Sequence, residues 1–148
     1  MTLKINTKAP EFKLQGSDGK EHSLSDYKDK KVVLYFYPKD DTPGCTIQAC
    51  NFRDGIDELK EAGFVVLGVS ADNIESHKKF IKKYDLNFVL LSDPEKKVIE
   101  NYKVLKEKSM FGKTFLGIQR STYVIENGII TKAIPKSSPK ECVDEILG

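Results

Sequence analysis

The sequence KVVLYFYPKDDTPGCT, residues 31–46, carries the strongest local signals for fold and chemistry in this chain. Its first seven residues are mostly apolar, β-branched or aromatic, which is typical of a strand buried on both faces. Thr42 can cap a helix and Pro43 suits its first turn. Gly63 ends the helical pattern that follows, whose apolar positions are Ile47, Ala49, Phe52, Ile56 and Leu59.

Further strand signals lie on both sides of this unit. Residues 64–69 and 88–91 are apolar runs and predict two more buried strands. Nearer the N-terminus, residues 3–14 and 20–24 predict short extended segments joined by a turn at Ser17-Asp18-Gly19. These segments precede the strand–helix unit.

Three further helices are predicted from their start signals. Asp72 or Asn73 can cap a helix that presents Phe80 and other apolar residues on one face. Asp93-Pro94 predicts the start of a second helix. Ser138-Pro139-Lys140-Glu141 has the pattern of a capping box with proline at the first helical position, and predicts the last one.

A hairpin completes the predicted elements. Asn127-Gly128 joins extended runs at residues 120–126 and 129–134, and this dipeptide is a strong hairpin signal. Residues 103–119 are less regular and predict a functional loop. The order of elements predicts an α/β fold with a mixed central sheet flanked by helices.

Composition excludes several functional classes. The chain has 148 residues and a formal charge of +2, with no cluster of basic and aromatic residues that would suggest nucleic-acid binding. The longest apolar run, residues 32–37, is far shorter than the about 20 residues that span a membrane. The length predicts a single domain over residues 1–148.

The cysteines indicate reducing conditions. The chain has three cysteines, an odd number that cannot all pair within it. Residues 1–6 lack the features of a secretory signal, so we expect a cytoplasmic protein whose thiols are reduced at rest. Cysteine chemistry is therefore the first function to consider.

Cys45 is the candidate nucleophile. It falls in the first turn of the predicted helix, at the carboxyl end of a buried strand, where α/β sheets place their sites. Free N–H groups and the helix dipole at that position favour a thiolate, which is the reactive form of cysteine.

Cys50 follows five residues later. In an intact helix the two Cα atoms would be roughly 8.7 Å apart, whereas a disulfide requires less than about 7 Å. The first turns must therefore unwind before these thiols can pair. We predict a two-state element, wound when reduced and locally unwound when bridged.

Spacing argues against other uses of these cysteines. Gln48 occupies the position that a Cys-x-x-Cys dithiol would need, and Asn51 occupies that of the arginine in a cysteine phosphatase or arsenate reductase loop. His22 and His77 are isolated in the sequence, so no metal site is predicted.

Residues 37–46 resemble the Pro-x-x-x-Thr-x-x-Cys signature of peroxiredoxins. Cys50, followed by Phe52-Arg53-Asp54, is similar to the bacterioferritin comigratory protein, or peroxiredoxin Q, class. The similarity continues through residues 90–93, 107–113 and 117–122. It implies a thioredoxin fold with an N-terminal β extension. It also implies reduction of hydrogen peroxide and organic hydroperoxides in antioxidant defence and redox homeostasis, without metal, haem or flavin.

The resemblance also implies residue roles. Cys45 would be the peroxidatic cysteine, which attacks the peroxide and becomes a sulfenic acid. Thr42 would hydrogen-bond the peroxide, Pro38 would shield the sulfur from water, and Arg120 would hold the thiolate and polarise the O–O bond. The N–H groups of Gly44 and Cys45 would complete the transition-state contacts.

The resolving step follows from the same resemblance. Cys50 would condense with the sulfenic acid to form an intrachain disulfide. Thioredoxin or a similar dithiol protein would then reduce this bridge. From the residues alone, the first interpretation of Arg120 is a surface cation and that of Thr42 is a helix cap; only the resemblance gives them these roles.

Some residues depart from the pattern or have alternative roles. Gln48 stands where many peroxiredoxins have a glutamate that orients the arginine. Cys142 is expected in the core face of the last helix rather than in catalysis. Arg53 is expected to form a salt bridge with Asp54 or Asp57. Met110 and Phe111 are expected to line the peroxide pocket, to cover the reduced helix or simply to anchor a loop.

Two alternative functions remain open from the sequence. One is a thiol–disulfide oxidoreductase, although the chain has no Cys-x-x-Cys motif. The other is a redox-regulated holdase, which would expose an apolar patch after oxidation. We expect a monomer or weak homodimer that binds neither nucleic acid nor membrane.

Overall fold

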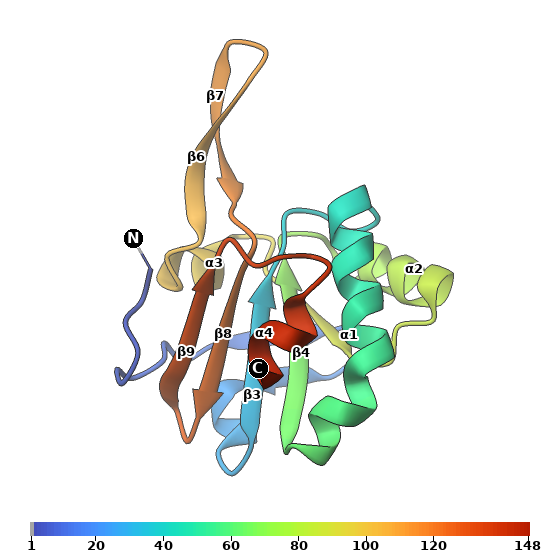
Figure 1. Ribbon diagram of the computed structural model, residues 1–148. Coiled ribbons are helices and arrows are strands. Elements are labelled where there is room, and N and C mark those ends of the chain that lie inside the picture. Colours follow the sequence, from blue (N-terminus) through green and yellow to red (C-terminus); the bar gives the residue numbers. More distant parts are fainter. Residues whose placement is uncertain (1) are drawn as a thin grey trace.

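The computed structural model describes residues 2–148, which form a mixed sheet with helices on both faces (Figure 1). The strands are β1 (Lys13–Gly16), β2 (Glu21–Ser23), β3 (Lys31–Phe36), β4 (Phe64–Ser70), β5 (Val89–Ser92), β6 (Leu105–Met110), β7 (Lys113–Ile118), β8 (Ser121–Glu126) and β9 (Ile129–Pro135). The helices are the 3₁₀ helix η1 (Leu24–Tyr27), α1 (Pro43–Glu61), α2 (Ile74–Tyr84), α3 (Lys97–Asn101) and α4 (Cys142–Leu147).

The main sheet has the strand order β2-β1-β5-β4-β3-β8-β9. Strands β3, β4 and β5 are parallel to one another, and β8 pairs antiparallel with β3 on its other side. The N-terminal hairpin β1–β2 pairs antiparallel with β5 and extends the sheet at that edge. This arrangement confirms the predicted thioredoxin fold with its N-terminal β extension.

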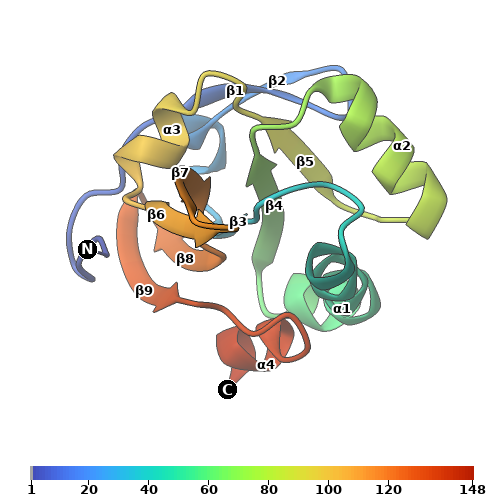
Figure 2. The ribbon, with the colours of Figure 1, turned by 90° about the horizontal axis from the view of Figure 1, so that it is seen from above.

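Strand β3 divides the core into two halves because its side chains alternate between the faces of the sheet. Val33 and Tyr35 pack with apolar residues of α1, α2 and α4. Val32, Leu34 and Phe36 pack with η1, α3 and the N-terminal segment on the opposite face. Figure 2 shows α1 and α4 on one side of the sheet and α3 on the other. Every β3 side chain after Lys31 is buried, as its continuous apolar sequence predicts.

Several local predictions are confirmed. Asn73 caps α2, since its side chain accepts a hydrogen bond from the Ser76 N–H. The Asn127-Gly128 turn joins β8 to β9 with both residues at positive φ, as a two-residue hairpin turn of this type requires. Gly63 follows the end of α1 at φ 88°.

The predicted starts of two helices are wrong. Helix α3 begins at Lys97 rather than after Asp93, because the buried Asp93 carboxylate accepts a hydrogen bond from the Ile99 N–H and holds a turn before the helix. Burial raises the pKa of Asp93. Helix α4 begins at Cys142, after a turn at residues 139–141, instead of at Pro139.

Residues 103–119 form a hairpin rather than an irregular loop. Strands β6 and β7 pair antiparallel over their whole length, and Phe111 and Gly112 turn between them with φ 54° and 76°. The hairpin projects from the body of the molecule (Figure 1). Its alternation is weak because most of its side chains are exposed, so the sequence lacks the usual signal of a half-buried strand. Within residues 2–148 no helix is long and apolar enough to cross a membrane.

Candidate active site

Cys45 lies in the first turn of α1, just beyond the carboxyl end of β3. Its side chain packs between the sheet and α1, leaving 2% of the residue exposed. Residues 37–42 connect the strand to the helix, and Pro38 is half-buried directly after Tyr37 in this connection. The apolar strand and the helix that Pro43 opens thus place a thiol at a helix N-terminus, as the sequence predicts.

Arg120 reaches Cys45 from a distant part of the chain. Strand β8 pairs with β3 so that Ser121 lies opposite Phe36, which puts the preceding residue, Arg120, beside the carboxyl end of β3. Both terminal guanidinium nitrogens lie 3.5 Å from Cys45 Sγ. The alternative of a surface cation is therefore wrong, because sheet register directs this side chain toward the thiol.

Gln48 holds the guanidinium in this position. Its Oε1 accepts a hydrogen bond of 2.8 Å from Arg120 Nη1, and the residue is fully buried one turn after Cys45. The amide therefore takes the role expected of the glutamate that it replaces. Gln48 Nε2 is buried without a hydrogen-bond partner among the described residues.

Thr42 occupies the N-cap position of α1 but does not cap it. Its Oγ1 donates a hydrogen bond of 2.8 Å to the Lys39 carbonyl instead. The expected side-chain cap is thus wrong, and the N–H groups of Gly44 and Cys45 donate no hydrogen bond to the Thr42 side chain. A helix cannot itself satisfy its first four N–H groups, so they can bind an anion or a polar ligand.

Gly44 allows the close approach of Arg120. A Cβ at this position would lie 2.9 Å from Arg120 Nη2, closer than side-chain carbons normally approach a neighbouring atom. The glycine thus leaves space for the Arg120 guanidinium, in addition to presenting its backbone N–H in the first turn of α1. The structure brings Thr42, Gly44, Cys45 and Arg120 together around the N-terminus of α1.

Cys50 is half-buried within the same continuous helix. All three cysteines are free. The wound form of the predicted two-state element is therefore the one observed, and the bridged form stays a prediction.

Cys142 is a core residue, as expected. It is 1% exposed, and its Sγ lies 2.9 Å from Asn51 Oδ1 on α1. Burial raises the pKa of this thiol to about 12. At neutral pH it is therefore protonated and a poor nucleophile.

Three other side chains have clear positions. Arg53 forms the expected salt bridge with Asp54, 2.9 Å between Nε and Oδ1. Met110 and Phe111 lie on the projecting hairpin and are 57% and 95% exposed. Neither forms an apolar cover for α1, so the expectation that they line or close the site is wrong.

The sequence did not predict a buried polar network that lies beside the loop between β3 and α1. His77, isolated in sequence, is fully buried on α2, and its Nδ1 lies 2.7 Å from the Asp40 carboxylate. Asp40 follows β3, and Asp72 and His77 follow its parallel neighbour β4. Polar residues after adjacent parallel strands meet at one sheet edge, a signal that could have revealed the network.

Known proteins share both the sequence and this architecture. The AhpC/TSA family model matches residues 5–133. The chain belongs to this family. Peroxiredoxin Bcp of Bacillus subtilis is 48% identical over 148 residues, covering 99% of this chain and 94% of the relative.

Two solved structures place this family member within the peroxiredoxin Q class. A cysteine-to-serine mutant of PrxQ from Xylella fastidiosa matches with a TM-score of 0.93 and 32% identity, over 99% of this chain and 94% of the other. The bacterioferritin comigratory protein of Xanthomonas campestris, studied for its alkyl peroxide reduction activity, matches with a TM-score of 0.87 and 36% identity, over 92% and 87%. This peroxiredoxin is thus a thiol peroxidase by family.

Proposed function

We propose that Cys45 is the peroxidatic cysteine of this enzyme and that its substrates are hydrogen peroxide and organic hydroperoxides. The observation that carries this proposal is the position of Arg120, with two guanidinium nitrogens 3.5 Å from a buried thiol at a helix N-terminus. A cation and the positive end of the helix dipole both stabilise a thiolate there.

The first step is nucleophilic attack on the peroxide. The Cys45 thiolate attacks the terminal oxygen, an S–O bond forms and the O–O bond breaks. The leaving alkoxide or hydroxide takes up a proton, so the products are a Cys45 sulfenic acid and an alcohol or water. Arg120 and the N–H groups of Gly44 and Cys45 stabilise the charge that moves onto the peroxide oxygens.

Thr42 would orient the substrate. Because its hydroxyl hydrogen is directed to the Lys39 carbonyl, its oxygen lone pairs are left to accept a hydrogen bond from the peroxide O–H. Pro38, directly after the buried Tyr37, would limit the access of water to the sulfur. Both roles fit the position of the loop.

Cys50 would then resolve the sulfenic acid. Its thiol attacks Cys45 Sγ, the sulfenic oxygen leaves as water, and a Cys45–Cys50 disulfide forms. This step requires the first turns of α1 to unwind. Thioredoxin or a similar dithiol protein would reduce the bridge, being oxidised to its own disulfide.

One assay tests the proposed activity. Peroxide consumption in the presence of thioredoxin, thioredoxin reductase and NADPH should depend on Cys45. A rate no higher than that of Cys45→Ser would contradict the peroxidase proposal. Mass spectrometry of the peroxide-treated protein should yield a Cys45–Cys50 peptide, and its absence would contradict the resolving role.

The assembly and location of the enzyme follow from this cycle. All proposed groups come from one chain, which supports function as a monomer or weak homodimer, testable by sedimentation equilibrium. The disulfide must be reduced in every turnover, which supports a reducing compartment, the cytoplasm. A stable higher oligomer in sedimentation would contradict the first of these.

A further inference from the structure

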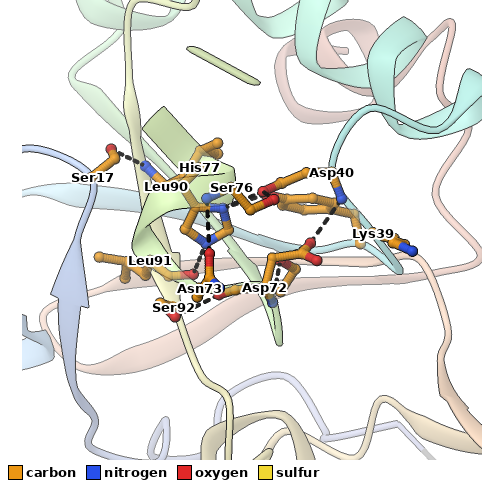
Figure 3. A network of polar contacts seen from close by, with 12 residues as sticks. Ser17, Lys39, Asp40, Asp72, Asn73, Ser76, His77, Leu90, Leu91 and Ser92 are labelled. Atoms are coloured by element: carbon orange, nitrogen blue, oxygen red, sulfur yellow. Dashed lines mark hydrogen bonds and ion pairs between the residues drawn. The ribbon is translucent and has the colours of Figure 1, made fainter. Parts of the chain in front are cut away.

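A buried hydrogen-bond network supports the loop between β3 and α1 (Figure 3). Asp40 is its centre, with a side chain only 3% exposed. One carboxylate oxygen accepts a hydrogen bond from the Tyr37 hydroxyl. The other accepts a 2.8 Å bond from Ser76 Oγ and lies 2.7 Å from His77 Nδ1. The loop is therefore fastened to α2, and the Tyr37 hydroxyl adds a contact within the loop itself.

Both ring nitrogens of His77 contribute to this attachment. Its Nε2 lies 2.9 Å from the Leu91 carbonyl oxygen, which can only accept, so Nε2 carries a hydrogen. Its Nδ1 lies 2.7 Å from the Asp40 carboxylate. Both ring nitrogens are thus engaged, and the ring is fixed between β5 and the loop.

Asp72 completes the network at the backbone. Its Oδ2 accepts two hydrogen bonds of 2.8 Å, one from the Asp40 N–H and one from Ser70 Oγ. The Asp40 N–H belongs to the peptide that also contains the Lys39 carbonyl. That carbonyl accepts the hydrogen bond from Thr42 Oγ1. One peptide group is therefore held by Asp72 at its N–H and by Thr42 at its oxygen.

The planarity of the peptide couples these two contacts. In a trans peptide the N–H and C=O point in opposite directions, so fixing one fixes the direction of the other. With the N–H directed to Asp72, the Lys39 oxygen faces Thr42 and takes its hydroxyl hydrogen. The ligand atoms of Asp40, Asp72 and His77 lie within 4.8 Å of one another, but hydrogen bonds already engage all three side chains.

We propose that Asp72, supported by Asp40 and His77, is a positioning residue that orients the Thr42 hydroxyl for peroxide binding. The inference rests on the proposed role of Thr42 in peroxide reduction. It assigns the effect to the attack of Cys45 on peroxide. Resolution by Cys50 comes later, after the start of α1 has unwound, and does not use the Thr42 hydroxyl.

Substitutions at Asp72 distinguish a positioning role of its carboxylate from a general effect on the structure. Asp72→Ala removes the acceptor, and we expect Cys45 oxidation by hydrogen peroxide to slow about tenfold. Asp72→Asn should stay within threefold of the wild type, because both hydrogen bonds converge on one oxygen and asparagine retains one. The second-order rate constant can be measured by competition with a haem peroxidase of known rate.

A double-mutant cycle with Thr42→Val tests the route of the effect. If Asp72 acts through the hydroxyl, Asp72→Ala should have no further effect once Thr42 is valine. Equal losses in both backgrounds, or no loss from Asp72→Ala alone, would overturn the proposal. The rate of Cys45–Cys50 disulfide formation from the sulfenic acid should be unchanged in Asp72→Ala, and a parallel loss there would also contradict it.

Controls distinguish this effect from a loss of folding and from a failure of the proposed peroxidase activity. Asp18→Ala removes a carboxylate that accepts the Lys20 N–H at the N-terminal hairpin, and should leave the rate unchanged. If Asp72→Ala does not fold, Ser70→Ala should give a smaller loss that Thr42→Val again abolishes; an additive loss would overturn the proposal. Failure of the peroxidase proposal itself would be distinct, because wild type would then not exceed Cys45→Ser.

Discussion

At the scale of single residues, the site depends on how closely one guanidinium is held to one thiol. Arg120 is only half-buried, so its position depends on the contacts that restrict it. Gln48 supplies an acceptor 2.8 Å from Nη1, and Gly44 leaves room on the other side. Neither residue reacts, yet both decide where the cation lies relative to Cys45.

Gln48 should be replaceable by another acceptor but not by an apolar residue. Gln48→Ala removes a hydrogen bond to a charged group, so we expect Cys45 oxidation by peroxide to slow about tenfold or more. Gln48→Glu should recover most of the rate, because Nε2 has no partner to lose among the described residues. Competition with a haem peroxidase measures both rates, and equal losses in the two variants would argue against an orienting role.

Gly44 should be intolerant of even one methyl group. Gly44→Ala would place Cβ 2.9 Å from Arg120 Nη2 and displace the guanidinium, with an expected loss of about tenfold or more in the same rate. Gly117→Ala is a matched control, since its methyl would lie 2.8 Å from the Lys108 side chain outside the site. A normal rate in Gly44→Ala would show that the arginine tolerates displacement.

At the scale of elements, helix α1 carries both thiols of the proposed cycle. Cys45 is in its first turn and Cys50 lies five residues later, on a different part of the helix circumference. In the proposed cycle the element must therefore remain wound to assemble the peroxide site and unwind to form the disulfide. Its attachment to the sheet through Phe52 and Leu59, both fully buried, leaves the later turns packed during this change.

Removal of the second thiol should separate the two steps. Cys50→Ser should keep the rate of Cys45 oxidation within about twofold while losing the intrachain disulfide and turnover with thioredoxin. A thiol trap specific for sulfenic acid, followed by mass spectrometry, should find the adduct on Cys45. Cys142→Ala is the control and should retain turnover, whereas a disulfide involving Cys142 would reassign the resolving residue.

The projecting hairpin should not contribute to peroxide attack. Phe111 is 95% exposed at its turn, so Phe111→Ser should leave Cys45 oxidation unchanged and alter the free energy of unfolding by less than about 0.5 kcal/mol. Urea unfolding and the competition assay measure these quantities. A slower oxidation would mean that the hairpin folds over the site in solution.

At the scale of the whole molecule, the core contains ionisable side chains whose burial in the folded state favours their neutral forms. Burial raises the pKa of Cys142 to about 12 from an ordinary value of 9.0. The pKa values of Tyr35 and Tyr37 are also raised well above normal by burial. The folded state therefore keeps protons that the unfolded chain releases at alkaline pH, and stability declines there.

The contribution of Cys142 has a defined pH window. Below pH 9 the thiol is protonated in both the folded and the unfolded state, so the free energy of unfolding loses nothing through its ionisation. Between about pH 9 and 12 only the unfolded chain ionises, which costs up to about 1.4 kcal/mol per pH unit. Urea unfolding from pH 7 to 10 should therefore show a shallower alkaline decline for Cys142→Ala than for wild type. Parallel declines would contradict the raised pKa.

Sequence alone determined the features that depend on neighbouring residues. The buried run of β3, the break at Pro38 and the periodic apolar face of α1 are local, and they predicted a cysteine at a helix N-terminus. The Asn127-Gly128 turn was equally clear, because few residues adopt positive φ at low cost. Local patterns failed in the exposed β6–β7 hairpin, where alternation is weak, and at α3 and α4, where cap-like sequences precede a turn rather than the helix itself.

Only the tertiary structure decided which distant groups meet at Cys45. The pairing of β8 with β3 brings Arg120 to the thiol across 75 residues of sequence. The parallel pairing of β3 with β4 likewise brings Asp72 and His77 to Asp40. Thr42 has the sequence of a cap, yet its hydroxyl donates to the Lys39 carbonyl held by this network. The physical reason is that hydrogen bonds and ion pairs depend on distance in space, which sheet register sets and local sequence does not.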